Sequence, residues 1–251
     1  MAGGPQGRIA IAVMAKAPQP GRSKTRLVPP LDAKGAAALS AAFLCDMTNN
    51  IALAAREMAV AGCVAYAPAG QEALFAGVLA PGTFLLLADG SPAMPPRVQG
   101  FGRCLLHAIR SLLATGYIGA CVLNSDSPTL PTDYLRRAAA ALARPGDRAV
   151  LGPAEDGGYY LLGLKHPHAH LFEDVAWSTE RVAEQTRARA DAIGLELVDL
   201  PVWYDVDNKF ALRRLVKEIA APSSAPTPYP APATACCART LGIAELLAAT
   251  A

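Results

Sequence analysis

The chain has 251 residues, 52% of them hydrophobic, and a chain of this length and composition can bury one large core as a single α/β unit. Lysine and arginine total 23 against 21 aspartate and glutamate, and this balance argues against a nucleic-acid partner, which a basic stripe would indicate. Charged or polar residues interrupt the apolar stretches before roughly 18 residues, so the sequence predicts no membrane span.

Cysteine usage and the first apolar run indicate the compartment. The six cysteines are either far apart or adjacent, with no C-x-x-C pair, which is not a zinc pattern. The run before Lys16 is better explained as a first strand than as a signal peptide. We therefore expect reduced thiols in a cytoplasmic protein.

Short β-type runs alternate with longer alanine-rich helical stretches along the chain. Strands are predicted over 8–15, 61–67, 83–88, 119–124, 147–152, 158–164 and 194–199. Helices are predicted over 33–58, 71–79, 101–115, 132–143, 179–192 and 208–220. This alternation predicts a mostly parallel sheet with helices on both faces, which binds ligands beyond the carboxyl ends of its strands.

The proline-rich stretch that begins at Ala221 divides the chain. Prolines and serines dominate the residues from 222 to 232 and cannot sustain a helix or a sheet, which is typical of a linker. We therefore expect a main domain over residues 1–220. Residues 221–251 should form a linker followed by one short helix over 241–247.

A basic loop follows the first predicted strand. Residues 16–27 combine prolines, one glycine and four cations, and this loop chemistry suits a polyphosphate because glycine lets the backbone approach while arginine and lysine grip phosphate oxygens. An ordinary solvated charged loop is the alternative. The candidate nucleotide-binding residues here are Lys16, Gly21, Arg22, Lys24 and Arg26.

Two acidic segments are candidates for a metal site. Asp126 ends an apolar strand in the pattern S-D-S-P, where a carboxylate could hold Mg²⁺ or Mn²⁺ against a diphosphate. A turn with a helix cap explains the same pattern. Asp205 and Asp207 lie at i and i+2 on one strand face, and Asp207 can cap the next helix as well as bind a metal.

A double-glycine turn with two acids separates two further apolar strands. Glu155 and Asp156 would face a pocket while Gly157 and Gly158 let the backbone approach a ligand, although a tight hairpin turn explains the pattern equally well. Trp177 is a candidate for stacking on a sugar ring, against the alternative that it buries apolar area.

Together these segments resemble the DUF2064 family, which is related to the nucleotide-diphospho-sugar transferases of the glycosyltransferase A superfamily. The motifs occur in order between about Arg8 and Leu215: K-A-P-x-P-G-x-x-K-T-R-L, S-D-S-P, G-P-x-x-D-G-G-Y-Y-L-L-G, W-S-T and D-V-D-N. The resemblance implies a single Rossmann-like three-layer α/β domain whose first loop binds the nucleotide diphosphate. It also implies that Asp126 stands where relatives carry a metal-binding D-x-D, and Asp207 where related nucleotidyltransferases place a second metal carboxylate.

The chain also departs from the family pattern. S-D-S keeps one acid where many glycosyltransferases have two, so a metal would need Asp207 or substrate phosphates as further ligands. The family tends to show an acidic residue after the glycine at position 100, and this chain has none. Gln99 and Gly102 are candidates for nucleobase contact, with simple helix entry as the alternative.

The resulting hypothesis is a metal-dependent transferase that uses a nucleotide-diphospho-sugar, with Asp156 or Glu155 as the base beside the acceptor. A nucleotidyltransferase acting on a phosphorylated substrate is the alternative, and it needs further cations. Because Lys165 is the only lysine or arginine between 150 and 178, we favour glycosyl transfer. A non-catalytic nucleotide-sugar binder is the third hypothesis, and a homodimer is left open.

Overall fold

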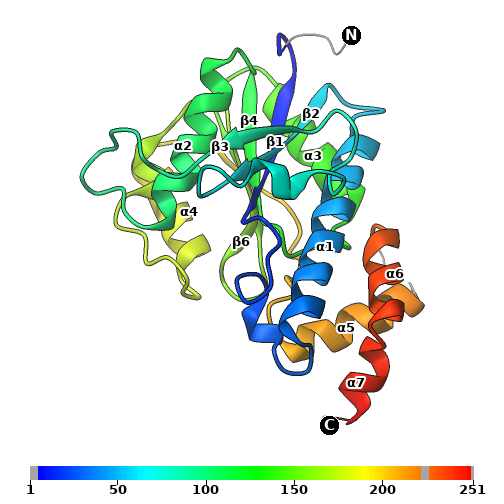
Figure 1. The fold of residues 1–251 in the computed structure, drawn as a ribbon. Coiled ribbons are helices and arrows are strands. Elements are labelled where there is room, and N and C mark those ends of the chain that lie inside the picture. The colour runs from blue at the N-terminus through cyan, green and yellow to red at the C-terminus, as the bar shows by residue number, and fades with distance from the viewer. Residues whose placement is uncertain (1–4, 222–225, 250–251) are drawn as a thin grey trace.

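The computed structural model of the protein describes residues 5–221 and 226–249 and contains one seven-stranded sheet of order β3-β2-β1-β4-β6-β5-β7 (Figure 1). β6 runs antiparallel to its neighbours β4 and β5, and the other pairs are parallel. This confirms the predicted mostly parallel sheet. The strands are β1 (Ile9–Ala15), β2 (Val60–Tyr66), β3 (Phe84–Leu87), β4 (Gly119–Leu123), β5 (Ala149–Pro153), β6 (Tyr159–Leu164) and β7 (Leu197–Asp199).

Helices cover both faces of the sheet and give the three-layer arrangement. They are α1 (Ala33–Ala54), α2 (Phe101–Ala114), α3 (Thr132–Ala143), α4 (Val182–Ala192), α5 (Lys209–Ala220), α6 (Pro232–Thr240) and α7 (Ile243–Ala249). Side chains of β1 alternate between the layers, because Ile9, Ile11 and Val13 join the core under α1 and α3, whereas Ala10 and Ala12 join the core under α2 and α4. Figure 1 shows these two helix pairs on opposite sides of the sheet.

Two predicted helices differ from the structure. The segment 71–79 forms only a 3₁₀ turn, Glu72–Phe75, because Gly70 and Gly77 adopt positive φ on either side and Phe75 alone is buried in it. The tail forms two helices, α6 and α7, instead of one over 241–247. Residues 222–225 of the predicted linker lie outside the described residues.

The tail packs on the main domain. α6 lies beside α1, and Ile243 and Leu247 of α7 belong to the larger core (Figure 1). Asp46, a fully buried carboxylate of α1, accepts hydrogen bonds from the backbone N–H groups of Ala233 at 3.0 Å and Thr234 at 2.6 Å. A residue of α1 thus caps the N-terminus of α6, which local sequence cannot reveal.

Replacing Asp46 by alanine should lower the free energy of unfolding by about 2 kcal/mol, because two backbone N–H groups of α6 lose their acceptor. Burial raises the pKa of Asp46, so asparagine, which keeps one acceptor oxygen and no charge, should cost less. Urea unfolding of the two variants checks this. Equal stability of Asp46→Ala and the wild type would contradict the capping role.

α1 is the one helix of the described residues that could cross a membrane by its length and composition. Alanine and small polar residues fill this stretch, and only Lys34 and Asp46 carry charge. Of its most apolar window, 61% is buried inside the protein, as in any core helix, so α1 is weak support for a span.

Candidate active site

A cavity of about 520 Å³ opens at the carboxyl ends of β1, β2 and β4. Its volume is in the range of small-molecule sites. Among the residues predicted as a site, six line it: Lys16, Arg22, Lys24, Arg26, Asp126 and Asp207. The structure therefore brings the basic loop and both metal-candidate carboxylates to one place, at the edge of the sheet where the strand pattern predicts ligand binding.

The four cations of the loop have different surroundings. Lys24 is 7% exposed at its side chain, where Nζ lies 2.8 Å from Asp126 Oδ1 and donates to the Val206 carbonyl at 2.6 Å. Arg26, 77% exposed, pairs with Asp207 at 3.1 Å. Lys16 and Arg22 are exposed and have no acidic partner among the described residues. Lys24 therefore ties the loop to the acids, while Lys16 and Arg22 are free to meet an anion.

Ser23, which the sequence analysis missed, holds the loop in shape. Its buried hydroxyl donates to the Ala17 carbonyl at 3.2 Å and accepts the Gln19 N–H at 3.1 Å. Gly21 has a φ of +73°, which favours glycine, and it lies outside the lining of the cavity. The side chain of Ser23 and the backbone of Gly21 thus form the turn that presents Arg22.

The two acidic segments are bound together through the backbone. The Val206 N–H donates to the Asp126 carbonyl at 2.8 Å, so Asp126 and Asp207 approach the cavity from adjacent segments. Two carboxylates suit Mg²⁺ or Mn²⁺, which prefer oxygen ligands. The described residues hold no group of three or more metal-binding side chains, so substrate phosphate and water would have to supply the other ligands.

Asp205 belongs to the same acidic cluster, although the sequence analysis did not select it as a site residue. Burial and the nearby charges of Asp156 and Asp207 raise its pKa to about 6, and Asp126 adds to the effect. The signal available in the sequence was the spacing of Asp205 and Asp207, which are two positions apart. The cluster concentrates negative charge beside the cavity, which favours a bound cation.

Asp205→Asn should raise the free energy of unfolding at pH 7.5, because a partly buried charge facing other carboxylates is removed. The folded-state pKa is raised, so the stability that protonated Asp205 contributes is present below about pH 4 and lost as pH rises through about 6. The gain should therefore disappear near pH 4. Urea unfolding at both pH values tests this, and the control is Asp133→Asn, which removes an exposed pair with Arg137 and should give no gain.

The double-glycine turn joins β5 to β6 as a hairpin, and none of its candidate residues lines the cavity. Glu155 pairs with Arg214 at 2.7 Å, whereas Asp156 accepts the Gly158 N–H at 2.8 Å and has no cationic partner in the described chain. A Cβ on Gly157 would lie 2.0 Å from the Glu180 carbonyl oxygen. Close packing before α4 thus explains this glycine without a ligand.

Gln99, Gly102 and Trp177 do not line the cavity. Gln99 is exposed, and its side-chain amide donates to the Pro96 carbonyl at 3.4 Å. Trp177 packs over Gly102, where a Cβ would come within 2.7 Å of the indole ring. Their neighbour Phe101, which the sequence analysis missed, does line the cavity.

The fold is that of the glycosyltransferase A type, as comparison with solved structures shows. A protein from Desulfovibrio desulfuricans G20, provisionally described as a nucleotide-diphospho-sugar transferase, shares 26% identity over 95% of this chain and 96% of its own, with a TM-score of 0.76. CMP:2-keto-3-deoxy-manno-octonic acid synthetase in complex with CTP shares 11% identity over 85% of this chain and 98% of its own, with a TM-score of 0.52. No curated protein matches the chain.

The chain belongs to the DUF2064 family, described as an uncharacterized protein conserved in bacteria, whose family model matches residues 50–179. This match contains Asp126 and the turn at 155–158. It is shorter than the resemblance predicted between Arg8 and Leu215, and it includes neither the basic loop nor Asp207.

Proposed function

We propose that the protein is a transferase that binds the diphosphate of a nucleotide-activated sugar in this cavity and passes the sugar to an acceptor. The observation that carries the proposal is the placement of Lys16 and Arg22, which have no acidic partner among the described residues, in one cavity with the carboxylates Asp126 and Asp207. The similarity over nearly the whole chain to the Desulfovibrio protein, with its provisional transferase description, supports it.

The charges of the cavity suit a diphosphate leaving group. Lys16 and Arg22 would bind its oxygens, and Arg26, which is exposed, can turn from Asp207 toward it. Asp126 and Asp207 would hold a divalent cation, which supplies charge neutralisation of the diphosphate when it is bound. Each contact strengthens as negative charge develops on the leaving oxygen.

We propose Asp156 as the general base that takes the proton from the acceptor hydroxyl. It has no cationic partner among the described residues, whereas Glu155 is held by Arg214. In the transfer, the acceptor hydroxyl gives its proton to Asp156 and its oxygen bonds to the anomeric carbon, while the bond from that carbon to the diphosphate breaks. Although Asp156 does not line the cavity, its charge contributes to the raised pKa of Asp205, which supports its closeness to the acidic cluster beside the cavity.

Nucleotidyl transfer is the second candidate, and helix α5 favours it. The absence of cations between 150 and 178, other than Lys165, favoured glycosyl transfer in the sequence. α5 brings Arg213, Arg214 and Lys217 around a second hollow, and Arg214 reaches the turn at Glu155. A phosphorylated substrate could use these cations, so the reaction must be decided by its products.

Calorimetric titration with nucleoside diphosphates, with and without Mn²⁺, tests the proposal. Lys16→Ala or Arg22→Ala should weaken binding by about 1.5–3 kcal/mol for each charge-assisted hydrogen bond to phosphate that the substitution removes. Arg239→Ala, an exposed cation of α6, is the control and should bind as the wild type does.

Product analysis then separates the reactions. Release of nucleoside diphosphate from a nucleotide-sugar supports glycosyl transfer, and Asp156→Asn should abolish it. Pyrophosphate formation that depends on a sugar phosphate would support the second candidate instead. Binding without turnover of any donor would leave a nucleotide-sugar binder, and no binding of any nucleotide would end the proposal.

A further inference from the structure

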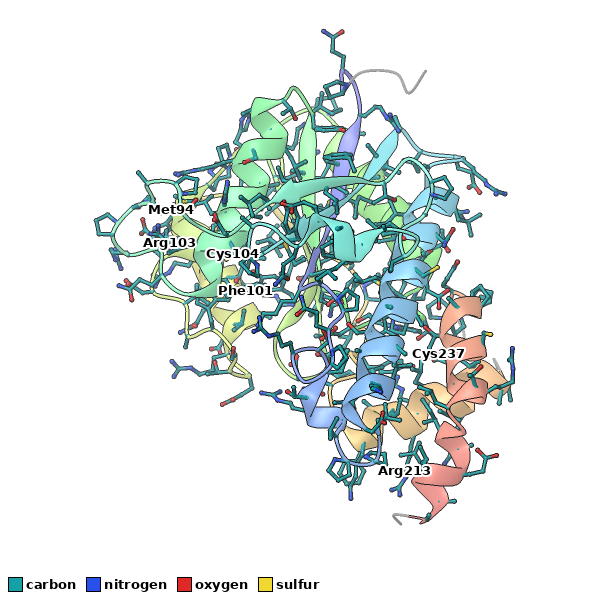
Figure 2. The ribbon with its side chains drawn as sticks, viewed as in Figure 1. Met94, Phe101, Arg103, Cys104, Arg213 and Cys237 are labelled. Carbon is teal, nitrogen blue, oxygen red and sulfur yellow. The ribbon has the colours of Figure 1, made fainter. Side chains whose placement is uncertain are left out.

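Part of the cavity lining is aromatic and apolar. Phe101 and Leu105, on the first turns of α2, line it together with Cys104, and Ala65 and Ala88 face it from the sheet edge. Figure 2 labels Phe101 and Cys104 at the end of α2 beside the loop that follows β1. The lining of one cavity thus includes both cations and apolar side chains, as a ligand with a charged part and a planar apolar part would require.

Phe101 is half exposed yet firmly held. Phe101 is 50% exposed, and its ring contacts the Trp177 ring edge to face, with ring centroids 6.1 Å apart. Trp177 is itself fixed, because it packs over Gly102 and meets the ring of Tyr159 at 6.5 Å. This packing leaves part of a preoriented aromatic ring open to the cavity.

We infer that Phe101 is the platform on which the nucleobase of the bound nucleotide stacks, an inference that rests on the proposed function. Among the described residues that line the cavity near Phe101, accessible side chains that could read base edges by hydrogen bonds are scarce, because the Tyr159 hydroxyl is buried. The Tyr66 hydroxyl donates to Glu72, and Cys104 offers only a weak donor. Because every base has a π-face, the site tolerates different bases, with purines favoured by their larger area.

The test compares nucleotides with a ligand that has no base. ADP, GDP, UDP, CDP and pyrophosphate are titrated with Mn²⁺ into the wild type and into Phe101→Ala. The four nucleotides should bind the wild type within about tenfold of each other. Phe101→Ala should weaken all four roughly tenfold or more and leave pyrophosphate unchanged, since only stacking is removed. Phe101→Trp should retain nucleotide affinity.

Phe210→Ala is the matched control, because Phe210 is 68% exposed on α5 and lies outside this cavity. Unchanged nucleotide affinity in Phe101→Ala would overturn the inference and leave the proposed function intact. A wild type that selects one base by more than about 100-fold would also overturn it, in favour of hydrogen-bond readout. Failure of the wild type to bind either pyrophosphate or nucleotides would instead defeat the proposed function.

Discussion

Lys24→Met is expected to lower the free energy of unfolding by roughly 2–4 kcal/mol, below the full cost of breaking a buried pair because Asp126 is one-third exposed. The Lys24 ammonium pairs with Asp126 and donates to the Val206 carbonyl, and methionine keeps the volume but satisfies neither group. Urea unfolding without nucleotide measures the loss.

Arg26→Ala is the control for Lys24. It removes an exposed pair with Asp207, so it should change stability by less than about 1 kcal/mol. In the double variant Lys24→Met, Asp126→Asn the carboxylate charge is gone too, and part of the stability should return. Similar small effects of Lys24→Met and Arg26→Ala would contradict the structural role of Lys24. The sequence does not distinguish the two cations, because both are candidates for nucleotide binding there.

Gly157→Ala is expected to cost about 3 kcal/mol or more of stability, which combines the strain of a positive φ with overpacking. Gly157 has a φ of +86°, and its Cβ would lie 2.0 Å from the backbone carbonyl of Glu180, which cannot swing aside as a side chain can. Thermal and urea unfolding measure the loss.

Gly82→Ala separates the two causes, because Gly82 has a φ of +82° with nothing within 4 Å of its Cβ. It should show only the conformational part, about 1 kcal/mol. If the two alanine variants were destabilised equally, the close approach to Glu180 would not matter. A clearly larger loss in Gly157→Ala than in Gly82→Ala would confirm that the turn packs against the backbone just before α4.

The sequence predicts the main domain well where local signals are strong. α3 begins and ends as predicted, at 132 and 143, because Pro131 precedes it and Pro145 disfavours helix at Arg144. The basic loop and Asp126 each follow a strand, and the parallel order of β1 and β4 brings both to one edge of the sheet. The positions of the strand ends in the sequence are thus enough to predict that these residues lie at the same edge of the sheet.

Features that depend on distant contacts could not be predicted in the same way. The pKa of Asp205 depends on Asp156 and Asp126, which arrive from other segments of the fold. The exposure of Phe101 depends on the packing of Trp177 over Gly102, and these two residues are 75 positions apart in the sequence. The start of α6 depends on a carboxylate of α1. Local periodicity contains none of these relations.

The cap on α6 has a consequence for the order in which the chain assembles. Asp46 and Ala233 are 187 residues apart, so Asp46 is synthesised long before the amides that it accepts. Contacts of such separation form late, because the intervening chain must first be arranged. The sheet can therefore form while Asp46 of α1 does not yet have α6 to cap. Closure of the α1 surface then waits until α6 has been synthesised, and a shortened chain that stopped at Ala221 would keep that surface open.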